Sequence, residues 1–239
     1  EALTFATPRQ SQRDTAAARK VQDIAVPGDY VAEMARQIAV EQFGEKAYEL
    51  GIRIVTTVTR ADQEAAYAAL RRGVIDYDRR HGYRGPESFA DLPGGTVSEE
   101  QLDEALGEVS DHGDLLAAVV LKASTKEVVV YRRGQEIRIT GKGLGFVAPM
   151  LAEKAPQSRR VRRGAIIRLR STGKDAWEIT QLPEVQAALV AVDSHSGAVR
   201  ALIGGFDFNR NKFNHVTQAV RQPGSSFKPF IFSAALDRN

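Results

Sequence analysis

Two runs of sequence near the C-terminal end carry the most structural information: ALVAVDSHSGAVRALIGGFDF from Ala188 to Phe208, and NKFNHVTQAVRQPGSSFKPFIFSAALD from Asn211 to Asp237. The first is apolar, turns at Ser194–Gly197 and returns, which predicts a β-hairpin. The second predicts a helix that starts near Ser225 and continues to Leu236. Apolar residues recur at helical spacing along one side of that helix: Phe227, Phe230, Ile231 and Ala234.

Ser225 and Lys228 are three residues apart, so on a helix they share a face. A serine hydroxyl is a poor nucleophile until a base takes its proton, and a lysine shielded from water has a pKa low enough to do so. Gly224 lets the chain turn sharply, and free N–H groups at the helix start can stabilise an oxyanion. The same spacing recurs at Ser171 and Lys174, in a predicted turn, so spacing alone does not decide the assignment.

The sequence around Ser225 and Lys228 provides evidence that their spacing alone does not. Asn211–Asp237 strongly resembles the start of the transpeptidase domain of class A penicillin-binding proteins, the bifunctional cell-wall synthases of bacteria. Ala188–Phe208 is similar to the strand pair that leads into it, and Gly51–Val58 and Asp78–Pro86 resemble the segment that joins the two catalytic domains. A stretch of five short predicted strands resembles the OB-like domain inserted in the Gram-negative 1A type. The matching core lies at Phe213-Asn214, Gln218-Ala219 and Arg221 to Phe230.

The resemblance implies an enzyme in which Ser225 is the nucleophile, also acylated by β-lactams, and Lys228 activates it. The parent protein would polymerise glycan strands and cross-link stem peptides ending in D-Ala-D-Ala, on the periplasmic face of the inner membrane. It implies a membrane anchor upstream and no cofactor. A regulatory protein at the OB-like domain is a further expected partner, and nucleic acid is not.

This sequence also lacks motifs and a domain that the family carries. The later Ser-x-Asn and Lys-Thr-Gly motifs of the transpeptidase are absent from this sequence, and so is a glycosyltransferase domain with its catalytic glutamate. We therefore expect an internal fragment that has neither activity by itself.

The expected fold class is α+β: a helical and linker segment, a small OB-like β-barrel, and an incomplete opening of a serine transpeptidase domain. The expected domains are residues 1–50, the helical tail of an upstream glycosyltransferase region; 51–86, a strand–helix linker; 87–182, the OB-like insert; and 183–239, the start of the transpeptidase domain.

Local patterns predict the individual elements. Tyr30–Phe43 has helical spacing, Ile52–Thr59 is rich in β-branched residues and predicts a strand, and Thr59 with Asp62 resembles a capping box at the start of a helix. Ser98 is expected to cap a short helix. The five strands of the OB-like domain are predicted at Leu115–Leu121, Glu127–Tyr131, Glu136–Thr140, Ala165–Leu169 and Ala176–Thr180.

Composition excludes several classes. The 239 residues carry a formal net charge of +3 and include 43% hydrophobic residues, which argues against disorder. Because the sequence has no cysteine, disulfides and thiolate chemistry are excluded. No apolar run approaches the roughly 18 residues of a membrane span. The histidines show no metal-ligand spacing, so no metal is expected: His81, His112, His195 and His215. Asp193 is expected in the hairpin turn, and Trp177 in the core.

One basic run leaves alternatives open. Ser158–Gly164, with Arg168 and Arg170, holds six arginines and no acid. A solvated basic turn, contact with a protein or an anionic cell-wall polymer, and nucleic-acid binding each fit it. The rival to the enzyme is therefore a non-enzymatic OB-like binding module for nucleic acid or a protein partner. A serine β-lactamase shares the Ser-x-x-Lys device but not the surrounding sequence.

Overall fold

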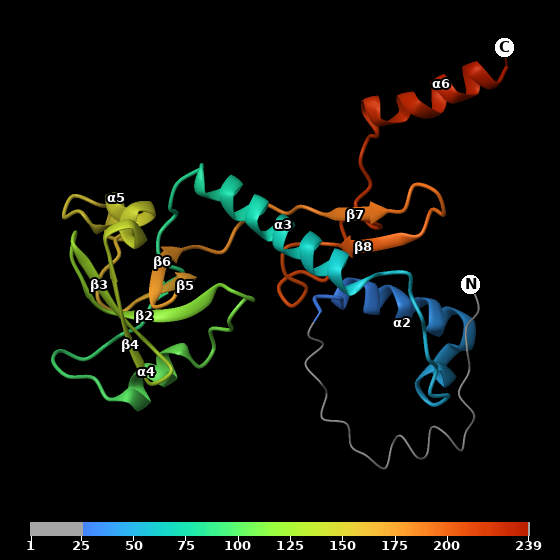
Figure 1. Cartoon of the computed structure of the whole chain (residues 1–239). Coiled ribbons are helices and arrows are strands. Elements are labelled where there is room, and N and C mark those ends of the chain that lie inside the picture. The colour runs from blue at the N-terminus through green and yellow to red at the C-terminus, as the bar shows by residue number, and fades with distance from the viewer. Residues whose placement is uncertain (1–25, 239) are drawn as a thin grey trace. The chain divides into compact units, whose positions relative to one another are not determined.

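The computed structural model describes residues 26–238, which form two compact units (Figure 1). One unit combines the chain up to Ala66 with Ala188–Gly205 and the residues from Phe213 onward. The other combines Tyr67–Ala187 with Phe206–Lys212. Part of the predicted domain 1–50 lies outside the described residues, and the boundaries between the four predicted domains stay predictions.

The second unit is built on an antiparallel sheet in the order β1-β5-β2-β3-β4, with β6 paired to β5. Its five longer strands confirm the predicted ones, and β1 (Ser88–Phe89) adds a short sixth. The nine-residue β5 pairs with β2 along one edge, while its other edge pairs with β1 at its start and with β6 at its end. The longer strands are β2 (Leu116–Ala123), β3 (Glu127–Arg132), β4 (Gln135–Thr140), β5 (Ala165–Gly173) and β6 (Ala176–Thr180).

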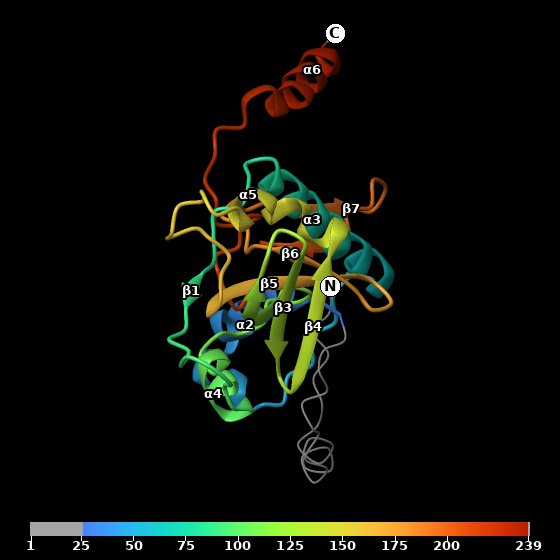
Figure 2. The same ribbon diagram turned by 90° about the vertical axis from the view of Figure 1, so that its left-hand side faces the viewer.

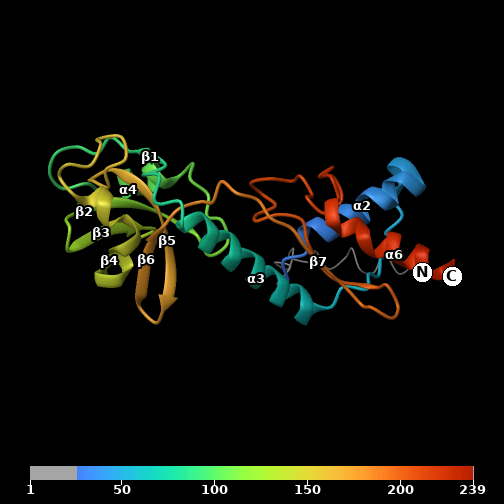
Figure 3. The same cartoon turned by 90° about the horizontal axis from the view of Figure 1, so that it is seen from above.

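The hairpin turns of this sheet follow from local chemistry. β3 and β4 lie side by side in Figure 2 and are joined by Arg133 and Gly134, both at positive φ, the backbone of a two-residue hairpin turn. The β5–β6 hairpin, seen along its length in Figure 3, turns at Lys174–Asp175 with Asp175 at φ 56°. Asp and Gly tolerate this conformation better than most residues do.

The sheet does not close into a barrel, which corrects that part of the expected fold. β4 and β6 approach each other without forming a ladder, and the 3-10 helix η2 (Gly141–Val147) contacts both. A Cβ at Gly143 would lie 2.2 Å from the Trp177 carbonyl oxygen and 2.8 Å from Ile139 Cγ2. The gap between the two strands is therefore filled by η2, and the close approach of this helix requires a glycine at position 143.

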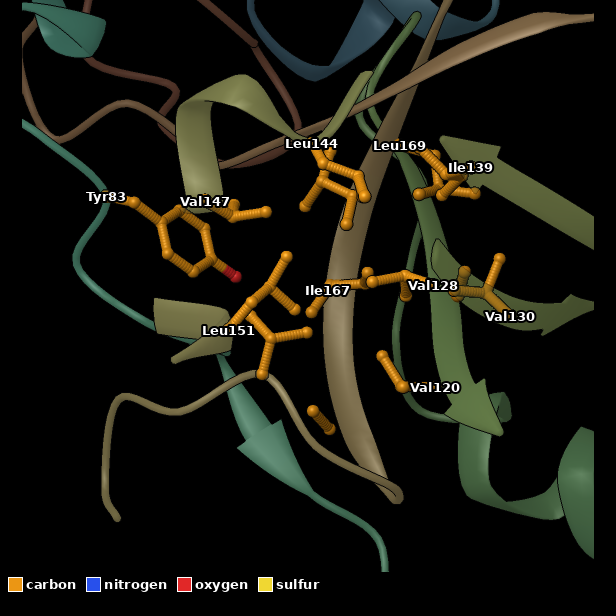
Figure 4. Packing of buried hydrophobic residues seen from close by; sticks show 14 residues of the cluster. Tyr83, Val120, Val128, Val130, Ile139, Leu144, Val147, Leu151, Ile167 and Leu169 are labelled. Carbon is orange, nitrogen blue, oxygen red and sulfur yellow. The ribbon is translucent and has the colours of Figure 1, made fainter. Parts of the chain in front are cut away.

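Two apolar clusters stabilise the second unit. The larger one fills the space between the curved sheet, η2 and α5 (Ala148–Leu151), and Figure 4 shows its side chains converging. Trp177 packs against it, as predicted. The smaller cluster lies on the other face of the sheet, under α4 (Glu99–Leu106), whose start is fixed by the predicted Ser98 cap in a capping box with Gln101. The larger cluster comprises Tyr83, Ala118, Val120, Val128, Val130, Ile139, Leu144, Val147, Leu151, Val161, Ala165, Ile167, Leu169 and Ile179.

The first unit contains α2 (Asp29–Phe43), a 3-10 helix (Gly44–Tyr48), the first turns of α3 (Arg60–Arg79), and the predicted hairpin β7 (Leu189–Val192) and β8 (Val199–Ile203). These confirm the predicted helix and hairpin.

The predicted strand Ile52–Thr59 is wrong, because within the described structure only Arg53 of this stretch takes part in a β-bridge and no strand forms. It binds β8 through single bonds instead: Thr57 Oγ1 donates to the Val199 carbonyl at 2.7 Å, and the Thr59 N–H donates to that of Arg200 at 3.0 Å.

Buried polar side chains of α3 form hydrogen bonds within each of the two units. Gln63 is 1% exposed and holds Leu202 of β8 through both its amide oxygen and its amide nitrogen, at 2.9 Å each. In the second unit, Arg71 donates to the carbonyl of Phe206 at 3.0 Å and to that of His112 at 2.8 Å, and its guanidinium lies 4.0 Å from the centre of the Phe206 ring. Helix α3 is thus fixed by specific hydrogen bonds as well as by apolar packing. No helix within residues 26–238 has the length and apolar character needed to cross a membrane.

Candidate active site

Ser225 and Lys228 lie on consecutive turns at the start of the C-terminal helical segment. Ser225 is in the 3-10 helix η3 (Gly224–Phe227), and Lys228 begins α6 (Lys228–Asp237). The Lys228 N–H donates to the Ser225 carbonyl, the i→i+3 bond of a 3-10 turn, in which side chains at i and i+3 lie one above the other. Gly224 enters this turn at φ 54°, a conformation that favours glycine. Both side chains are exposed.

Helix α6 is apolar on all sides, not on one side as expected. Phe230, Ile231 and Phe232 are 69%, 54% and 62% exposed, and Leu236 is 77% exposed. A helix that is hydrophobic all round is typical of a buried one. Residues 26–238 leave α6 uncovered, so they do not supply the packing around Ser225.

The β7–β8 hairpin, which precedes this segment in the chain, has a hydrogen-bonded turn. In the β7–β8 turn, Asp193 Oδ1 accepts hydrogen bonds from the Ser196 hydroxyl at 2.7 Å and from the Ser196 N–H at 2.8 Å, which confirms its expected role. These bonds lower the pKa of Asp193. In the second unit, Asp207 Oδ2 lies 3.4 Å from His112 Nδ1.

A turn at Asn214 is the last buried point before Ser225, and no sequence pattern assigned a function to it. Asn214 is 6% exposed, and every residue from Pro223 to Arg238 is exposed. The His215 N–H donates to the Gly204 carbonyl at 2.8 Å, and His215 Nδ1 lies 2.9 Å from the same oxygen. The sequence signals were the place of Asn214 and Gln218 in the core of the family resemblance and the spacing of an Asn four residues before a Gln, which is compatible with a capped turn.

The basic run is largely structural. Arg162 stacks on the Phe89 ring at 4.3 Å, and Arg163 donates to the carbonyl of Pro93 at 2.9 Å and to that of Gly95 at 2.7 Å. Arg168 is 2% exposed, so the hypothesis of a solvated basic turn is wrong for it.

Arg168 and Arg170 both pair with carboxylates. Arg168 forms two 2.7 Å bonds to Glu87, and Arg170 pairs with Glu178 at 2.6 Å. Four of the six arginines thus have intramolecular partners, while Arg159, Arg162 and Arg163 are exposed to solvent.

The remaining candidates carry no site within the described part of the chain. Ser171 lies in β5, paired with Trp177, and its Oγ donates to the Gly173 carbonyl, so the prediction that the second Ser-x-x-Lys match is a turn is correct only for Lys174. Residues 26–238 hold no group of three or more His, Asp or Glu side chains arranged for a metal ion.

Comparisons with known proteins agree with this architecture. Residues 83–185 match the penicillin-binding protein OB-like domain, and residues 187–239 match the penicillin-binding protein transpeptidase domain. Penicillin-binding protein 1A of Neisseria lactamica is 43% identical over 222 residues, which are 92% of this chain and 28% of that protein. The corresponding protein of Escherichia coli K12 is 40% identical over 224 residues, 90% of this chain and 26% of that protein.

The crystal structure of penicillin-binding protein 1A from Haemophilus influenzae is also similar. It has a TM-score of 0.72 and 32% identity, and the match covers 87% of this chain and 30% of that one. The chain thus spans between a quarter and a third of the length of these relatives. It belongs to the class A penicillin-binding protein 1A family, of which it carries the OB-like domain and the start of the transpeptidase domain.

Proposed function

We propose that this chain carries the nucleophile of a serine D,D-transpeptidase within a peptidoglycan synthase, with Ser225 as the acylated residue and Lys228 as its base. The observation that supports this best is the 3-10 turn that places the two side chains one above the other, directly after Gly224 at positive φ. The alternative pair, Ser171 and Lys174, lacks this support because the Ser171 hydroxyl is bonded within its hairpin.

The proposed chemistry is acyl transfer in two steps. Neutral Lys228 accepts the hydroxyl proton of Ser225 while the oxygen attacks the carbonyl carbon of the penultimate D-Ala of a stem peptide. The peptide C–N bond then breaks, and the terminal D-Ala leaves with a proton, so that an ester to Ser225 remains. An amine of a neighbouring stem peptide attacks this ester, forms the cross-link and returns the proton to the serine. A β-lactam would be opened by the same attack and stay attached.

The activities of the whole protein are further proposals from the family resemblance. We propose that a protein of this family that contains this chain polymerises glycan strands as well as cross-linking them, at the periplasmic face of the inner membrane. Its partners would be glycan strands, stem peptides, β-lactams and a regulatory protein at the OB-like domain. By itself the chain is expected to turn over no D-Ala-D-Ala peptide, because the Ser-x-Asn and Lys-Thr-Gly motifs are absent from its sequence.

The test uses a chimaera in which this chain replaces the matching segment of the E. coli relative. The chimaera is incubated with fluorescent penicillin, and covalent labelling is measured on a denaturing gel. We expect labelling that Ser225→Ala abolishes and Lys228→Met slows by orders of magnitude, while Ser226→Ala, one residue away, leaves labelling in place. Undiminished labelling of the Ser225→Ala protein would refute the proposed nucleophile.

A further inference from the structure

The turn at Asn214 is held by reciprocal hydrogen bonds between its first and last residues. The Asn214 N–H donates to Gln218 Oε1 at 2.6 Å, and the Gln218 N–H donates to the Asn214 carbonyl at 2.8 Å. Inside the turn, Asn214 Oδ1 accepts the Val216 N–H at 3.0 Å, the geometry of an Asx-turn. Four backbone groups of a short irregular segment, three N–H and one carbonyl, are thereby satisfied within five residues.

This turn is packed closely against the end of β8. A Cβ on Gly204 would lie 2.6 Å from Asn214 Oδ1 and 2.6 Å from Cδ1 of Tyr30, so only glycine fits beneath the asparagine. The Gly204 carbonyl also receives the N–H of His215. The turn is therefore fixed both internally and against a strand of the same unit.

The amide nitrogen and the amide oxygen of the Asn214 side chain differ in their hydrogen bonding. Nδ2 is buried and has no hydrogen-bond acceptor among residues 26–238. The known contributions of the side chain are therefore the Oδ1 bond to Val216 and the volume above Gly204. A serine at this position can supply the same type of oxygen acceptor, whereas an alanine of similar size cannot.

Resting on the proposed function of Ser225, we propose that Asn214 and Gln218 are positioning residues for acylation. Ser225 follows Gln218 by seven residues, and the Asn214 turn is the last buried anchor before it. The direction in which the chain leaves this anchor sets where the η3 turn can lie. Attack on a carbonyl tolerates little misplacement, because a shift of about 1 Å can cost roughly a hundredfold in rate.

The experiment measures the rate and the extent of penicillin acylation of the chimaera separately. Asn214→Ala and Gln218→Met each remove one acceptor of the turn and are expected to lower the acylation rate constant by roughly tenfold or more, with full labelling at long times. Asn214→Ser restores an acceptor for the Val216 N–H and is expected to recover most of the rate. Asn209→Ala changes an exposed asparagine five residues away and serves as the matched control.

The outcomes separate the two proposals. If the chimaera is labelled at Ser225 but all four variants react at the same rate, the positioning role is refuted and the proposed function stands. If Asn214→Ala and Asn214→Ser lower only the fraction of protein labelled at saturation, the turn serves folding alone and the positioning role is refuted. Labelling that persists in Ser225→Ala overturns both. Gln218 is exposed, so its variant leaves no cavity and keeps the test valid if Asn214→Ala folds poorly.

Discussion

Replacing Arg168 by methionine should unfold the OB-like unit at markedly lower denaturant concentration. The Arg168 side chain is 2% exposed and makes three charge-assisted hydrogen bonds: two of 2.7 Å to Glu87 and one of 2.6 Å to the Ser110 carbonyl. Methionine keeps an apolar stem in place but supplies no donor. Breaking a buried ion pair typically costs about 3–5 kcal/mol.

The expected loss lies at the lower end of that range. The Glu87 side chain is 33% exposed, so water can solvate the carboxylate once its partner is gone. We expect a decrease of about 3 kcal/mol in the free energy of unfolding. With a urea slope of about 2 kcal/mol per molar, the unfolding midpoint should fall by about 1.5 M.

Trp177, the only tryptophan, packs on the core of this unit and reports its unfolding by fluorescence. Arg159→Met is the matched control, since Arg159 is an exposed member of the same basic run and should change stability by less than about 0.5 kcal/mol. Equal midpoints for Arg168→Met and Arg159→Met would refute the structural role of Arg168. In a double-mutant cycle with Glu87→Gln, the two losses should sum to more than the loss in the double variant.

Three further predictions concern the same unit. Gly143→Ala should destabilise it by about 1–3 kcal/mol in urea unfolding, because the new methyl meets the Trp177 carbonyl at 2.2 Å; an unchanged midpoint would contradict the close packing of η2. Gly73→Ala, in the interior of α3 with open space around it, should instead stabilise by about 0.5–1 kcal/mol, measured in the same way. Burial, followed by the charge of Glu87, raises the pKa of Tyr83, so its contribution to stability is complete below the usual tyrosine pKa of about 10 and declines as pH rises beyond it. The urea midpoint should therefore fall less steeply above pH 10 in Tyr83→Phe than in the wild-type chain, and identical slopes would exclude this cause.

Elements with a strong local pattern could be predicted from the sequence. The runs of β-branched residues gave the OB-like strands to within a few residues. The Thr59 cap of α3 forms as expected, with Thr59 Oγ1 accepting the Asp62 N–H at 3.3 Å and the Thr59 hydroxyl donating to the Asp62 carboxylate at 2.7 Å. The Ile52–Thr59 run failed because strand propensity describes a half-buried pleated surface and does not fix the regular backbone pairing that a ladder needs. In this fold, single side-chain and backbone bonds occupy the edge of β8 instead.

The long-range polar contacts could not be predicted from local patterns. Arg168 and Glu87 are 81 positions apart, and Gln63 and Leu202 are 139 apart. In the sequence, Arg168 looks like any other arginine of a basic run, because burial depends on the face of β5 that it occupies. Ser225 and Lys228 were found through the surrounding motif, whereas the Asn214 turn depends on its packing against Gly204.

The most direct test of the central claim is to locate the β-lactam adduct by mass spectrometry. The chimaera with the E. coli relative is treated with benzylpenicillin, digested, and the modified peptide is fragmented between Ser225 and Ser226. We expect one added penicillin mass, on Ser225, and none on the adjacent serine. An adduct on Ser226, on Ser171 or outside Asn211–Asp237 would contradict it.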